Sequence, residues 1–151
     1  MSRPDERIHV TTRRATEADH EFVFQLRKAA LGTYIEATWG WDDAYQRALH
    51  DRRFAEQPMD VLLVGEERIG SLLVERTDEE IVLVSIYLLP AWQSRGIGSR
   101  ILASLAKEAD ARKIPIRLKV LRVNERAVAL YERFGFVVID TTATHHGMRR
   151  P

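Results

Sequence analysis

The segment Gln93-Ser94-Arg95-Gly96-Ile97-Gly98 has the residue types of an anion-binding turn. It follows an apolar run that ends at Leu89 and precedes apolar residues at helical spacing. Glycines let backbone N–H groups approach a ligand, and the first N–H groups of a helix lack partners, so this turn and Ser99 predict a pyrophosphate site. Arg95 and Arg100 add positive charge there, although a tight turn without a ligand explains the glycines equally well. The segment lacks Gly-Lys-Ser/Thr and a third glycine, which argues against a nucleotide triphosphatase loop and a dinucleotide fingerprint.

A second segment, Asn124-Glu125-Arg126-Ala127-Val128-Ala129-Leu130-Tyr131-Glu132-Arg133-Phe134-Gly135-Phe136, follows the turn in the C-terminal half of the chain. With the turn, it resembles the GNAT superfamily of acyl-CoA N-acyltransferases, whose signatures are Q/R-x-x-G-x-G/A and N-x-x-A-x-x-L-Y-x-x-x-G-F. The N-terminal half matches only in its order of elements. The resemblance implies an α+β fold (an α/β/α sandwich): a mixed, mostly antiparallel central sheet of six to seven strands flanked by about four helices.

The resemblance also implies roles for particular residues, with acetyl-CoA as co-substrate. Residues 93–99 would hold its pyrophosphate, and backbone groups of Ile86 and Leu88 would bind its pantetheine arm and thioester. A backbone N–H near Leu88 would stabilise the oxyanion, Asn124 would contact the cofactor, and Tyr131 would act as general acid. Each residue also has a purely structural interpretation, as part of a buried strand, as a helix N-cap or as a core tyrosine.

The general base is not evident, because Lys119 stands where some members of the family carry a glutamate. A base is needed because an ammonium group has no lone pair with which to attack. His145 and His146 have a suitable intrinsic pKa. The remaining candidates are a chain of water molecules and the acids Glu36, Asp42 and Asp43.

The stretch from Tyr34 to Asp43 combines aromatic and acidic residues. In the family it resembles, this region borders the acceptor pocket, so Tyr34, Glu36 and Trp39 are predicted to bind the acceptor. Aromatic faces and carboxylates suit a cationic amine. Packing in the core or at the start of a helix is an equal alternative, above all for Trp41.

Periodicity predicts the elements that position these residues. We expect a strand over residues 8–14, a helix from Thr16 that Gly32 stops, and an irregular stretch to Gly40. A helix from Asp42 to about Phe54 should turn Tyr45, Ala48 and Leu49 inward. The further strands are expected at residues 61–64, 69–74, 81–89, 116–123, 136–139 and 144–149, with helices after residues 97 and 124.

Composition limits the class of protein. The 151 residues suffice for one core, so a single domain spanning residues 1–151 is expected. A net charge of +1 argues against nucleic acid or a membrane as partner. The absence of cysteine excludes a cysteine nucleophile and thiolate metal sites, and we expect no metal. No segment has the length of a membrane span, so we expect a cytoplasmic protein, as a monomer or homodimer.

Together these features predict an N-acetyltransferase that transfers an acetyl group from acetyl-CoA to a primary amine by direct attack in a ternary complex. The acceptor, a small amine or a peptide or protein amine, is not identified by the sequence. Two alternatives are an acyl-CoA-binding regulatory module without catalysis, which Lys119 suggests, and an interaction domain that keeps only the fold.

Overall fold

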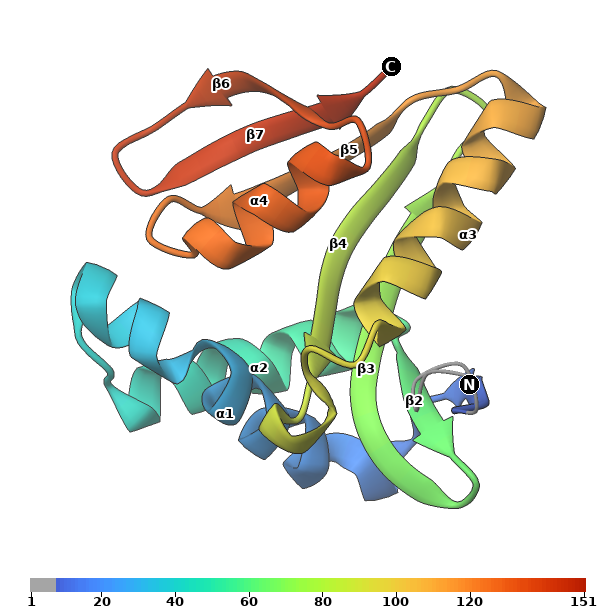
Figure 1. The fold of residues 1–151 in the computed structure, drawn as a ribbon. Coiled ribbons are helices and arrows are strands. Elements are labelled where there is room, and N and C mark those ends of the chain that lie inside the picture. Colours follow the sequence, from blue (N-terminus) through green and yellow to red (C-terminus); the bar gives the residue numbers. More distant parts are fainter. Residues whose placement is uncertain (1–7) are drawn as a thin grey trace. The chain divides into compact units, whose positions relative to one another are not determined.

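The computed structural model describes residues 8–151 and shows four α-helices and a seven-stranded mixed sheet (Figure 1). The α+β prediction is confirmed. The helices are α1 (His20–Trp39), α2 (Asp43–Glu56), α3 (Ile97–Arg112) and α4 (Glu125–Arg133). The strands are β1 (Val10–Arg14), β2 (Asp60–Val64), β3 (Glu67–Arg76), β4 (Ile81–Leu88), β5 (Ile116–Leu121), β6 (Val137–Thr141) and β7 (His145–Arg150).

The strand order is β1-β2-β3-β4-β5-β7-β6. The pairs β1–β2, β2–β3, β5–β7 and β6–β7 are antiparallel, whereas β4 and β5 are parallel. The β4–β5 register pairs residues 81–83 with residues 116–118, and β4 then continues to Leu88. A parallel pair needs a crossover connection, and here the crossover is α3.

The described chain divides into two compact units. The first holds residues 8–73 and 85–97, and the second holds residues 74–84 and 98–151. This division does not decide whether the chain is a single domain, which stays a prediction.

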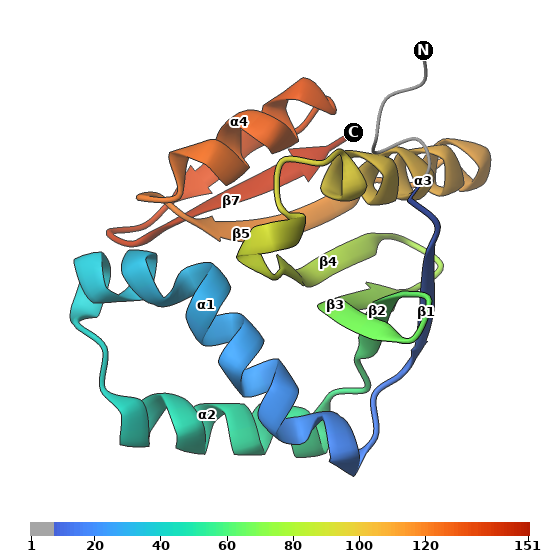
Figure 2. The ribbon, with the colours of Figure 1, turned by 60° about the horizontal axis from the view of Figure 1, so that its bottom comes forward.

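In the first unit, α1 and α2 pack against each other (Figure 2). Aromatic and histidine rings fill the contact: the His50 ring of α2 lies 5.6 Å from Phe24 and 4.6 Å from His20, both on α1. Gly70 on β3 lies so close to β4 that a methyl group there would overlap the carbonyl oxygen of Tyr87. A residue without a Cβ is therefore required where these two strands meet.

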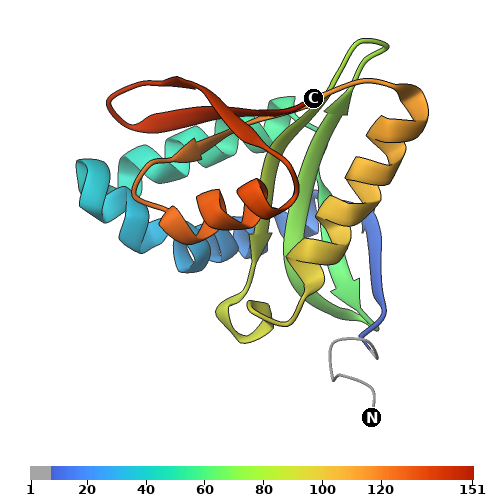
Figure 3. The same ribbon diagram turned by 45° about the horizontal axis from the view of Figure 1, so that its top comes forward.

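In the second unit, α4 precedes the β6–β7 hairpin (Figure 3). Asn124 caps α4, since its side-chain oxygen accepts from the Ala127 N–H at 3.2 Å. Gly135, with φ 90°, ends the helix as expected. Tyr131 is buried at 9% exposure, with its ring centroid 5.8 Å from that of Phe136.

Two local predictions are wrong. The helix α1 does not stop at Gly32 but continues to Trp39 and ends at Gly40, whose φ is 81°. Gly32 has ordinary helical geometry, and packing of the helix outweighs its low helix propensity. In α2, Tyr45 is 63% exposed and Ala48 is also exposed, while Gln46 and His50 face inward. The buried face is polar, so a hydrophobic pattern could not identify it.

Candidate functional site

The predicted anion-binding turn follows β4 after one 3-10 turn at Pro90–Trp92, and its residues 93–97 belong to the first unit. Its first side chain, Gln93, donates from Nε2 to the carbonyl oxygen of Leu88 at 2.9 Å. The Leu89 N–H donates to Ile69 O at 2.9 Å, and the Trp92 N–H donates to Leu89 O at 2.8 Å. These bonds hold the turn against the end of the strand, so Leu88 and the predicted phosphate loop form one rigid local structure.

The turn has the backbone geometry of an anion cradle. Ser94 and Gly96 have positive φ angles of 60° and 83°, and α3 begins at the next residue, Ile97. Alternating backbone handedness points successive N–H groups to one side, and the open N–H groups of the first helical turn follow them. Ile97 is fully buried and anchors the start of the helix. This arrangement fits a pyrophosphate without a large positive charge.

The structure constrains the two glycine positions of the turn in different ways. Gly96 is favoured by its φ angle of 83°, since a residue with a Cβ is strained there. A Cβ added at Gly98 would meet only Leu130 Cδ2, at 3.8 Å, which is an ordinary contact. The fold should therefore accommodate alanine at Gly98 without a steric clash. Nearby, the Arg95 guanidinium lies 4.5 Å from the centroid of the Trp92 ring, which orients this cation.

The residues predicted to carry proton transfer lie in the second unit. Asn124 caps α4, which confirms its structural role, and Tyr131 lies on the buried side of the same helix. His145 and His146 are both partly buried on β7. Because the structure describes each unit by itself, the catalytic roles of these residues remain predictions.

The two histidines differ in environment. Burial, with a smaller contribution from the Lys119 ammonium, lowers the pKa of His145, and its Nδ1 lies 2.8 Å from Thr144 Oγ1. His146 Nδ1 lies 2.9 Å from Thr141 Oγ1. His145 is thus neutral at pH 7 and able to accept a proton.

The predicted acceptor residues lie on the last turns of α1. Trp39 is 58% exposed, and Tyr34 is half-buried. Glu36 Oε2 accepts from the Trp41 N–H at 2.7 Å and so closes the connection to α2. Trp41 has a structural role, because its indole donates to Asp43 at 3.2 Å and lies under the Lys28 ammonium.

Polar residues that the sequence reasoning missed lie between α1 and α2. Arg27 Nη1 donates to Gln46 Oε1 at 2.5 Å, and His50 Nε2 lies 2.8 Å from the carbonyl oxygen of His20. Residues 46, 50 and 53 share one face of α2 at helical spacing, a signal that a search for polar rather than apolar periodicity would have found.

Known proteins resemble this chain in sequence and fold. Residues 21–136 match the family described as the acetyltransferase (GNAT) family. The chain belongs to this family. The thialysine N-epsilon-acetyltransferase of Sus scrofa is 31% identical over 121 residues, which cover 69% of this chain and 71% of that protein.

Two solved structures share the fold. The PaiA N-acetyltransferase of Thermoplasma acidophilum, in complex with coenzyme A, gives a TM-score of 0.73 at 18% identity and covers 95% of this chain and 99% of that one. An acetyltransferase from Thermus thermophilus gives 0.71 at 19% identity, with 95% and 97% covered.

Family membership makes the chain an acetyl-CoA-dependent N-acetyltransferase. Within residues 8–151, no three His, Asp or Glu side chains are arranged to hold a metal ion. In the same part of the chain, every helix is too short or too polar to cross a bilayer.

Proposed function

We propose that this protein transfers the acetyl group of acetyl-CoA to the primary amine of a small, lysine-like acceptor by direct attack in a ternary complex. The observation that carries the proposal is the turn from Gln93 to Gly98, which is tied to Leu88 and opens into α3. The relative that acetylates thialysine supports an aliphatic amine as the acceptor.

The chemistry assigns one task to each group. The neutral amine attacks the thioester carbon, and the carbonyl oxygen becomes an oxyanion that the Leu88 N–H stabilises. The carbon–sulfur bond then breaks, and Tyr131 gives a proton to the thiolate of coenzyme A. Since a thiol has a pKa of about 8.5 and a tyrosine about 10, this transfer assists departure without being indispensable.

His145 is the best candidate for the base that receives the proton of the amine. Burial lowers its pKa, so the ring is neutral at pH 7. Lys119 offers no carboxylate for this task, and its charge favours the neutral ring. The same lysine is the reason to test a regulatory module without catalysis as a second candidate.

A thiol-release assay over a panel of primary amines, with mass spectrometry of the products, tests the proposal. Tyr131→Phe and His145→Asn should lower kcat, while His9→Asn, an exposed histidine on the first unit, is the matched control. If coenzyme A raised the melting temperature of the protein but no amine caused thiol release, the regulatory module would be favoured. Full turnover by Tyr131→Phe across the pH range would remove the general-acid assignment.

A further inference from the structure

Lys119 is a primary amine on the exposed side of β5. The residues of this strand alternate, since Leu118 and Val120 are buried whereas Lys119 is exposed. Arg117, the other basic residue on this side, forms an ion pair with Glu80 at 2.9 Å. Lys119 forms no ion pair with any described residue. Its charge therefore has no structural role as half of an ion pair within the described chain.

The strands β5 and β7 lie side by side in the second unit (Figure 1), and their register places Lys119 next to His145. Lys119 is opposite Gly147, and Leu121 is opposite His145, in an antiparallel pair. Opposite residues share a face of the sheet, as do alternate residues of one strand, so Lys119 and His145 are diagonal neighbours on one face. Diagonal neighbours lie roughly 7–8 Å apart, a distance that the flexible four-carbon stem of a lysine can span.

Two groups that can accept a proton share this face with Lys119. Burial is the main cause that lowers the pKa of His145, and the Lys119 ammonium is the second, which agrees with the register. On the far side of Gly147, the Asp140 carboxylate of β6 lies over the glycine, because a Cβ there would overlap it. An imidazole is a stronger base than a carboxylate, so His145 is the group beside Lys119 that can take its proton.

Lys119 also lies at the point where β5 stops pairing with β4. The parallel register ends with Leu83 opposite Leu118, although β4 continues to Leu88 and β5 continues to Leu121. Lys119 is therefore the first residue of β5 beyond this pairing. Leu88, whose N–H the proposed function assigns to the thioester, belongs to the part of β4 that is not paired with β5. The amine and the proposed thioester-binding backbone both follow the end of the same pairing.

We propose that Lys119 is a site of self-acetylation, at which the side-chain amine receives the acetyl group of acetyl-CoA bound to the same chain. This inference rests on the proposed function. It adds a lysine of the chain itself to the free amines as an acceptor. The modified side chain is a neutral amide, so acetylation removes the charge that lies beside His145.

The step balances with the groups already assigned. The Lys119 ammonium gives one proton to His145, and the neutral Nζ attacks the thioester carbon. A nitrogen–carbon bond forms, the carbon–sulfur bond breaks, and the second proton of the nitrogen leaves with coenzyme A as its thiol. His145 then releases its proton to solvent. The products are acetyl-lysine, coenzyme A and one proton, without any further reactant.

The test is incubation of the purified protein with acetyl-CoA in the absence of any added amine. Intact-mass spectrometry before and after incubation counts the acetyl groups, and peptide mapping locates them. Lys119→Arg keeps the positive charge but removes the amine, and Lys113→Arg is the matched control from another exposed lysine of the second unit. His145→Asn tests the proton acceptor. The melting temperature of each variant shows that it is folded.

We expect one acetyl group per chain, on Lys119, and a release of thiol that stops at one equivalent per chain. The rate per chain should not depend on protein concentration, because amine and thioester belong to the same chain. Lys113→Arg should react like the unaltered protein, Lys119→Arg should lose this acetyl group, and His145→Asn should react roughly 100-fold more slowly. Comparable labelling of Lys119 and Lys113, a rate per chain that rises with protein concentration, or an unslowed reaction in His145→Asn would overturn the inference.

These outcomes can be told apart from those of the proposed function. Thiol release with free amines but no acetyl group on Lys119 would overturn the inference and leave the proposed function intact. Acetylation of Lys119 without turnover of any free amine would support the inference and remove the free amine as acceptor. If neither reaction occurred, both would fail.

Discussion

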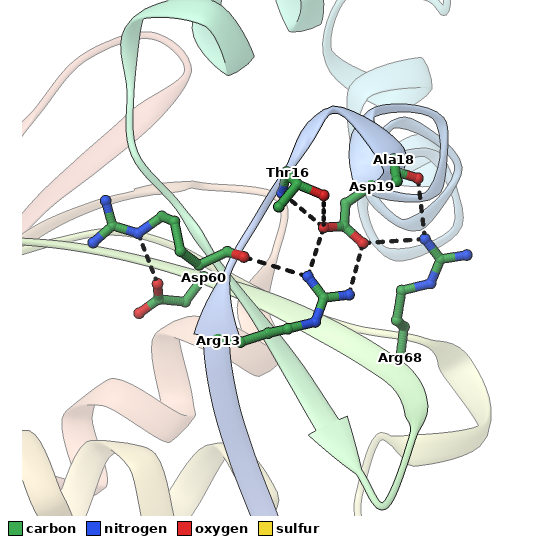
Figure 4. A network of polar contacts seen from close by, with 7 residues as sticks. Arg13, Thr16, Ala18, Asp19, Asp60 and Arg68 are labelled. Atoms are coloured by element: carbon green, nitrogen blue, oxygen red, sulfur yellow. Dashed lines mark hydrogen bonds and ion pairs between the residues drawn. The ribbon is translucent and has the colours of Figure 1, made fainter.

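Replacing Asp19 with asparagine should destabilise the first unit, because this carboxylate joins three parts of it (Figure 4). Asp19 is 1% exposed and accepts from Arg13 at 2.7 and 2.9 Å, from Arg68 at 3.2 Å and from the Thr16 N–H at 2.8 Å. The asparagine side chain has the same shape but no negative charge, and its NH2 group would face N–H donors where the carboxylate oxygen accepted their hydrogen bonds. The link from β1 and β3 to the start of α1 is then broken.

The size of the effect follows from burial. Both arginines are partly exposed, at 43% and 38%, so solvent screens their share of the attraction. We therefore expect a loss of about 2–3 kcal/mol, the cost of disrupting a buried acceptor of charge-assisted hydrogen bonds. At about 2–4 °C per kcal/mol, the melting temperature should fall by about 4–12 °C.

The matched control is Asp60→Asn, which removes an exposed pair with Arg14 in the same region. That change should cost no more than about 0.5 kcal/mol. Thermal and urea unfolding measure both variants. Melting temperatures of the two variants that agree within about 1 °C, a difference of about 0.3–0.5 kcal/mol by the same scaling, would refute the reasoning.

The dependence on pH provides a second check. The arginines hold the pKa of Asp19 well below its usual range. A depressed carboxyl pKa contributes stability above the unfolded value of about 3.9 and loses it as the pH falls toward the folded value. The difference in stability between the unaltered protein and Asp19→Asn should be constant near neutral pH and shrink below about pH 4.

Three further predictions concern the site. Gly96→Ala should cost about 1–2 kcal/mol and weaken coenzyme A binding, while Gly98→Ala should leave unfolding unchanged; equal unfolding midpoints would contradict this. Gly70→Ala should lower the free energy of unfolding by about 1–3 kcal/mol and lower the affinity for coenzyme A, because the new methyl group displaces Tyr87. Urea unfolding measures the stability and calorimetry the affinity, and no change in either would disprove the close approach of the two strands. In the pH profile of kcat/KM, the loss of activity on the acid side should lie below pH 6.5, the ordinary histidine pKa, because a base with a lowered pKa stays deprotonated to lower pH. This acid-side loss should vanish in His145→Asn, and its persistence in that variant would exclude His145 as the base.

Most strand positions were predictable because β2, β3 and β4 contain apolar runs separated by turn residues, and because apolar and basic residues alternate along β5. The capped helix α4 was equally clear, since Asn124 and Gly135 mark its ends through local chemistry. Gly32 misled the prediction for α1, since its weak local preference is outweighed by packing along the whole helix.

The polar contact between the two helices was not predictable. Gln46 and His50 are buried only because Arg27 and the His20 carbonyl supply partners from a segment distant in the sequence. Sequence patterns treat such residues as surface positions, which is the bias behind the inward assignment of Tyr45.

By itself the sequence determined the family and predicted the donor loop, because the motifs from Gln93 to Gly98 and from Asn124 to Phe136 are local patterns of residues. Only the tertiary structure decided that Gln93 is tied to Leu88 and that Lys119 is left beside His145 without an ion-pair partner among the described residues. The physical reason is that the approach of a ligand to backbone depends on neighbouring residues, whereas the pairing or isolation of charges depends on which distant segments the fold brings together.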